Sequence, residues 1–205
     1  METTREKVSY CIGLETGKNL KQQFSDMDEK LLEAGFRDAL TGSEPKLKND
    51  EIKSILIALR QQIEGQQKEY VAKLAEHNKK SGEAFLAENK TKEGIKVLPS
   101  GLQYKVIQAG TGPSPKALDV VTANYQGSFI DGKVFDSTYD DKPQSFPVGR
   151  VIPGWSEVLQ LMKVGDKWQV FIPSYLAYGE MGFGNAIGPN MTLVFEMELV
   201  SIDGK

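Results

Sequence analysis

Proline is distributed unevenly along the 205-residue chain, and this constrains the fold more than any other feature. Pro45 is the only proline before Pro99, and the other eight of the nine prolines lie from Pro99 onward. Because a helix interior tolerates proline worse than any other residue, the first half of the chain is free to be helical, whereas the second half is interrupted by turns. The sequence therefore predicts two parts of different class.

Two short helices are expected at the N-terminus. Segment 4–22 carries apolar residues at roughly helical spacing. Ser25 is expected to cap a second helix, which runs to about Leu40 and ends at Gly42. The single cysteine, Cys11, is expected to be a small buried residue of the first helix. Neither helix is long enough to form a core alone.

A long helix is expected at 49–89, a stretch without a strong stop signal. Its first half carries an apolar stripe, and its second half is polar nearly all round, which is typical of a helix that bridges domains through solvent. We predict a helical dimerisation domain at 1–48 and a linker helix at 49–89. Two copies are expected to interlock, because so few apolar residues supply little core, and a three-helix bundle within one chain is the alternative.

Short alternating segments separated by turns follow the helices. The dipeptide Asp131-Gly132 between two such segments is a strong hairpin signal. A short helix is expected at 155–162, after a further strand and a Pro-Gly turn. Residues 98–205 are therefore predicted to form an α+β domain, in which an antiparallel five-stranded sheet wraps on one short helix.

Residue counts exclude several classes of function. The net charge of −3 provides no basic field that would recruit nucleic acid. One cysteine and one histidine, His77 in a charged run, exclude a His/Cys metal site and a Cys–His catalytic pair. No nucleotide-binding or hydrolase motif is present, so neither a metal nor a cofactor is expected.

No membrane span and no secretory leader are expected. No apolar run approaches the ~18 residues that a membrane-spanning helix needs. The first ten residues, METTREKVSY, lack the apolar stretch of a leader. As written, the chain is expected to be cytoplasmic, and a chain whose leader had been removed would read the same.

Aromatic side chains are the feature of the C-terminal half from which a binding pocket could be built. Trp155 follows Pro153 and Gly154 directly and opens the short helix. An indole at the start of a helix can form the bottom of a pocket, although a tryptophan is more often a core residue. This half of the chain contains no histidine, no cysteine and no paired carboxylates in an apolar setting.

Several segments, in this order, resemble FK506-binding-protein (FKBP)-type peptidyl-prolyl isomerases. They are NYQGSFIDGKVFDS, FPVGRVIPGW, LQLMKVGDKW, IPSYLAYGE, IGPN and TLVFEMEL. The segments VSYCIGLETGKNL, SGEAFLAENK and LPSGLQYKVI resemble the helical half of the macrophage infectivity potentiator (Mip) group. The resemblance implies a homodimer formed through the N-terminal helices and a bacterial periplasmic or envelope location if a leader was removed. It also implies proline-containing unfolded or peptide substrates and macrolide inhibitors of the FK506 and rapamycin type.

The same resemblance implies roles for individual residues. Trp155 would lie under the substrate proline ring, and the Tyr178 hydroxyl and the Ile152 amide would bond to substrate carbonyls. Asp136 would accept a hydrogen bond from Tyr125 and orient it. The implied catalytic residues are Asp136, Tyr178, Ile152 and Trp155. The implied substrate-binding residues are Tyr125, Phe135, Phe146, Val151, Phe183, Ile187 and Phe195. The sequence departs from the family pattern at Gln144, where an aromatic residue is usual, and in the loop of Phe183 and Ala186.

Prolyl isomerisation needs none of the groups that the chain lacks. Rotation about an Xaa-Pro bond meets a barrier of about 18–20 kcal/mol, and no proton has to move. An apolar cavity disfavours the polar planar amide relative to the twisted one, and an acceleration of about 10⁵ needs only about 7 kcal/mol. We expect an isomerase that assists protein folding. The alternatives are a module that binds proline peptides with little turnover, and a chaperone whose helical half is the working part.

Overall fold

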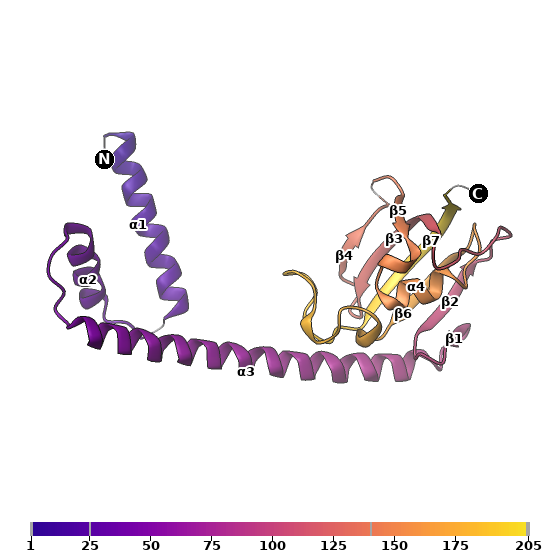
Figure 1. Cartoon of the computed structure of the whole chain (residues 1–205), viewed down its shortest axis with the longest axis horizontal. Helices are drawn as coiled ribbons and strands as arrows, with labels where there is room; N and C mark the ends of the chain where they lie inside the picture. The colour runs from indigo at the N-terminus through magenta and orange to yellow at the C-terminus, as the bar shows by residue number, and fades with distance from the viewer. Residues whose placement is uncertain (1, 25, 140, 204–205) are drawn as a thin grey trace. The chain divides into compact units, whose positions relative to one another are not determined.

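The computed structural model describes residues 2–24, 26–139 and 141–203 (Figure 1). The chain divides into two compact units, Met1–Gln62 and Ile63–Lys205. None of the helices in the described part of the chain combines the length and the apolar character that a membrane crossing requires.

The first unit contains α1 (Thr4–Gln23), α2 (Glu29–Thr41) and the start of α3 (Asn49–Asn89). A capping box formed by Thr3 and Glu6 begins α1. The Asp28 carboxylate caps α2 by accepting hydrogen bonds from two backbone N–H groups, and Ser25, the expected cap, lies outside the described residues. The predicted end of α2 at Gly42 is confirmed, because this glycine takes the left-handed conformation with φ 68°.

No described residue of the first unit is buried in the single chain. Ile12 of α1 is 63% exposed and Leu40 of α2 is 85% exposed. Cys11 is also exposed, so the prediction of a buried cysteine is wrong for the single chain, because no second layer of structure covers that part of α1. α2 has a clear apolar face, and no described residue of the single chain buries it.

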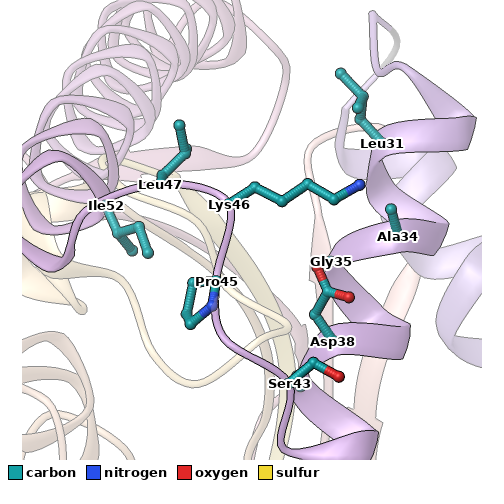
Figure 2. Close-up of a pocket in the computed structure, with 10 residues that line it drawn as sticks. Leu31, Ala34, Gly35, Asp38, Ser43, Pro45, Lys46, Leu47 and Ile52 are labelled. Atoms are coloured by element: carbon teal, nitrogen blue, oxygen red, sulfur yellow. The ribbon is translucent and has the colours of Figure 1, made fainter.

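Two apolar hollows lie between the helices of this unit. One, of about 470 Å³, lies between α2, the connection to α3 and the first turn of α3. Figure 2 shows Leu31 and Ala34 on the α2 side of this hollow and Leu47 and Ile52 on the other. The second, of about 670 Å³, lies between α1 and α2 and is lined by residues such as Ile12 and Phe36.

The second unit is built on an antiparallel sheet of seven strands. These strands are β1 (Ile95–Val97), β2 (Gln103–Gln108), β3 (Val120–Phe129), β4 (Val134–Ser137), β5 (Gln144–Pro147), β6 (Lys167–Ile172) and β7 (Leu193–Ile202). Their order is β1-β2-β6-β7-β3-β4, and β5 pairs with β3. The α+β architecture and the hairpin at Asp131-Gly132 are confirmed, with Gly132 at φ 87°. The strands exceed the expected five, and the strand that was not predicted at all is β1, whose three residues are too few for an alternating pattern to show.

Helix α4 (Pro153–Leu159) buries Trp155, Val158 and Leu159 against one face of the sheet (Figure 1). It spans 153–159 rather than 155–162, because Pro153 can occupy the first helical position and Leu161 and Met162 already belong to the following turn.

The last turns of α3 cover the opposite face of β6. Successive residues of a strand point to opposite faces. Phe171 lies 5.9 Å from the Phe85 ring of α3, whereas the next residue, Ile172, lies against α4 at Gly154. The end of α3 therefore does not cross solvent as its polar composition suggested, and it is part of the second unit.

Candidate active site

Side chains from β3, β4, β5, the turn before α4, α4 itself and the loop after β6 line one cavity of about 270 Å³. They are Tyr125, Phe135, Asp136, Phe146, Arg150, Val151, Ile152, Trp155, Tyr178 and Phe195 of β7. The structure thus brings together every residue that the resemblance implied, except Phe183 and Ile187.

Trp155 lies at the centre of a group of perpendicular rings. It is 5% exposed, and the rings of Tyr125, Phe146 and Phe195 lie 5.0, 5.4 and 5.2 Å from it, at interplanar angles of 78°, 83° and 85°. Edge-to-face contacts of this kind stabilise a fixed arrangement of rings. The aromatic cavity therefore has rigid walls.

The start of α4 fixes the position of Trp155 in the chain. Ile152 precedes the helix with extended backbone, and its carbonyl accepts hydrogen bonds from the N–H groups of Trp155 and Ser156 at 2.9 and 3.1 Å. Gly154 lies so close to Ile172 that a Cβ atom would meet the Ile172 Cγ2 at 2.5 Å. Only glycine lets α4 approach the sheet this closely.

Two phenol groups provide the polar part of the cavity. The Tyr125 hydroxyl donates a hydrogen bond of 2.6 Å to the Asp136 Oδ2. Burial raises the pKa of Tyr125 and the hydrogen bond to Asp136 raises it further. Burial, together with the nearby Asp136 charge, also raises the pKa of Tyr178. Both phenols therefore keep their protons at neutral pH, and the Tyr178 hydroxyl can donate a hydrogen bond.

Thr138 holds Asp136 in register beside Tyr125. Its hydroxyl accepts from the Tyr125 N–H at 2.9 Å, and its own N–H donates to the Tyr125 carbonyl at 2.9 Å. Gly127 in β3 leaves room for the rings of Phe135 and Phe195, which a Cβ atom would meet at 2.6 and 2.8 Å. Neither supporting residue was singled out from the sequence.

Phe183 and Ile187 lie outside the cavity. The Phe183 ring is 63% exposed and stacks on the Tyr178 ring at 4.9 Å. Ile187 is 5% exposed and belongs to the core, and its backbone exchanges two hydrogen bonds with Phe183. Arg150, in contrast, lines the cavity, and the only sequence hint was its place directly before Val151.

The arrangement can enclose a small apolar ring and donate hydrogen bonds to carbonyl oxygens at its rim. Asp136 accepts from Tyr125, so it serves to orient that ring. Within the described ranges, no three His, Cys, Asp or Glu side chains gather where they could hold a metal ion.

Comparisons with known proteins cover both halves of the chain. Residues 5–106 match the family described as the domain amino terminal to FKBP-type peptidyl-prolyl isomerase, and residues 112–200 match FKBP-type peptidyl-prolyl cis-trans isomerase. The outer membrane protein MIP of Legionella longbeachae is 46% identical over 203 residues, which cover 98% of this chain and 87% of that protein. The peptidyl-prolyl cis-trans isomerase Mip of Coxiella burnetii is 40% identical over 206 residues, or 100% and 90% of the two chains. The crystal structure of FkpA from Escherichia coli is similar with a TM-score of 0.78 and 34% identity, over 98% of each chain.

Proposed function

This chain belongs to the FKBP-type peptidyl-prolyl cis-trans isomerases, and we propose that it catalyses the reaction in the aromatic cavity above Trp155. The observation that carries this proposal is the set of perpendicular rings around Trp155. These rings border an apolar hollow of about 270 Å³ that is also lined by two phenol groups. A prolyl ring fits the chemistry of the hollow, and the preceding amide would lie near Tyr178 and Asp136.

In this proposal the cavity accelerates rotation by removing water from the amide. The planar amide is more polar than the twisted one, so moving it from water into an apolar site costs the ground state more than the transition state. The Tyr178 hydroxyl and the Ile152 amide would hold the substrate carbonyls while the prolyl ring stays fixed on Trp155. No proton transfer is involved, which agrees with phenols whose pKa values are raised.

The test measures the cis-to-trans rate of an Ala-Leu-Pro-Phe-type peptide with the full chain, with and without FK506. We expect acceleration that FK506 abolishes, and a loss of at least about tenfold in kcat/KM for Trp155→Leu, since the ring under the proline is removed. Tyr178→Phe removes only a hydroxyl and should lower kcat/KM less than Trp155→Leu does. Full activity in Trp155→Leu would contradict the site, and a folded wild-type chain without acceleration would favour a proline-binding module.

The exposed apolar faces of the first unit support a homodimer formed through the N-terminal helices. α1 and α2 bury nothing in the single chain, and two hollows of about 470 and 670 Å³ lie between its helices. Contiguous apolar surface of this kind marks an interaction site, and a second copy supplies complementary helices. Two isomerase domains in one dimer would engage the same unfolded chain with a raised effective concentration, which supports assistance in folding.

A further inference from the structure

The end of α3 contacts the last part of the loop that follows Tyr178 and contains Phe183. Asn78 and Gly82 are one helical turn apart and therefore lie on the same face of α3. The Asn78 Nδ2 donates a hydrogen bond of 2.8 Å to the Pro189 carbonyl. Gly82 is buried, and a Cβ atom there would lie 3.0 Å from the Thr192 Cβ. Both contacts are within the second unit.

Residues 179–190 form a closed loop, whose two ends are bonded to each other and whose last residue contacts this helix. The Asn190 N–H donates to the Gly179 carbonyl at 2.8 Å, and its side-chain Nδ2 donates to the Ala75 carbonyl at 3.5 Å. Apart from glycines, Asn190 alone among the described residues has a positive φ, 54°. The Asn78 side chain thus donates from α3 to the loop, and the Asn190 side chain donates from the loop to α3. We call these two hydrogen bonds the α3 anchor.

The path from the α3 anchor to the cavity is short. Gly179, which closes the loop with Asn190, is adjacent to Tyr178 in the chain. The Tyr178 ring lines the cavity and stacks on Phe183, which lies in the loop. A shift of Pro189 and Asn190 away from α3 would therefore move the loop on which the Tyr178 ring rests.

We propose that Asn78 is a positioning residue for the isomerase reaction, which holds the 179–190 loop so that Tyr178 faces the substrate. The inference rests on the proposed role of Tyr178. Asn78 touches neither substrate nor the reacting amide. Its contribution is to fix, from the long helix, one hydroxyl at the rim of the cavity.

Asn89 provides the matched control, because its side-chain amide also donates a hydrogen bond from α3, but to a residue outside the loop. Its Nδ2 donates to the Gln103 Oε1 at 3.0 Å, and the Gln103 Nε2 donates to the Leu86 carbonyl at 2.8 Å. Asn89 is 3% exposed, so its removal should disturb the docking of α3 at least as much as removal of Asn78. Neither of these two hydrogen bonds involves a residue of the 179–190 loop.

The experiment compares Asn78→Ala, Asn190→Gly and Asn89→Ala, each in the full chain, by peptide turnover and by hydrogen exchange. Asn190→Gly removes the side-chain amide but keeps a residue that accepts φ 54°. Both anchor variants should lose about three- to tenfold in kcat/KM, the range of one hydrogen bond, and the amides of 179–190 should exchange faster by a similar factor. Asn89→Ala should lower stability but leave loop exchange and turnover close to wild type.

A double variant tests whether Asn78 acts through Tyr178. Asn78→Ala should cost little further activity when Tyr178 is already phenylalanine, because the hydroxyl that the anchor positions is absent. Equal exchange in the anchor variants and wild type, or equal losses of turnover in Asn78→Ala and Asn89→Ala, would overturn the inference. If wild type lacked turnover, the proposed site would fail, and faster loop exchange would still establish the anchor.

Discussion

The Tyr125–Asp136 hydrogen bond joins two strands at the wall of the cavity, and its loss should be measurable in turnover. We expect Tyr125→Phe to lower kcat/KM about three- to tenfold and stability by about 1–3 kcal/mol, since the Asp136 carboxylate loses its phenol partner. Peptide assays and urea unfolding check both values. Tyr139→Phe is the control, because its hydroxyl bonds to Glu196 at 3.3 Å outside the cavity. Equal effects in the two variants would contradict a role in the site.

The two cavity phenols also predict how stability depends on pH. Their folded-state pKa values lie above the usual 10.0, mainly through burial. Below about pH 9 both phenols are protonated in the folded and the unfolded chain, so they add no slope. Above pH 10 the unfolded chain releases protons that the folded chain retains, and stability falls as pH rises. Urea midpoints from pH 6 to 11 should show this fall, with a shallower slope for Tyr125→Phe; equal slopes would contradict it.

The sequence predicted the residues of the cavity better than the residues that support them. Trp155 was conspicuous because it directly follows Pro153 and Gly154, which begin α4. Gly127 and Thr138 were missed, because their contacts depend on which strands pair, and no local sequence pattern indicates strand pairing. Phe183 and Ile187 lie outside the cavity because the loop folds back and places one on the surface and the other in the core.

At the scale of the element, two glycines of α3 should respond oppositely to the same substitution. Alanine usually stabilises a helix by about 1 kcal/mol relative to glycine, and Gly65, where a Cβ atom would meet nothing within 4 Å, should follow that rule. At Gly82 the new methyl group meets Thr192, so Gly82→Ala should lose this gain and destabilise the chain. Urea unfolding of both variants checks the signs, and stabilisation by Gly82→Ala would contradict the close docking of α3.

The elements themselves were largely predictable, whereas the docking of α3 was not. Its apolar stripe and lack of stop signals indicated a continuous helix. Besides the Phe85–Phe171 ring contact, however, the docking uses Gly82, Asn89 and the buried Gln103, which are small or polar residues. Hydrophobic periodicity cannot detect the part of an interface that consists of side-chain amides and a glycine.

At the scale of the whole molecule, the proposed dimer should be separable from catalysis. Leu40→Asp places a charge in the hollow between α1 and α2 and should give a monomer by sedimentation. Its kcat/KM for a short peptide should stay at the wild-type value, while its help in refolding a protein should fall, because bivalency is lost. Leu118→Asp, at a 97% exposed position of the second unit, is the control. A monomeric wild type would contradict the dimer.

The place of β7 in the sheet has a consequence for the order in which the molecule can be made. This strand comes after the other six in the chain, yet it lies between β3 and β6, with Val121 paired to Ile202. During synthesis the helices of the first unit emerge early and depend on local contacts, whereas the catalytic sheet cannot close until β7 has left the ribosome. A chain that assists the folding of others therefore completes its own catalytic half last.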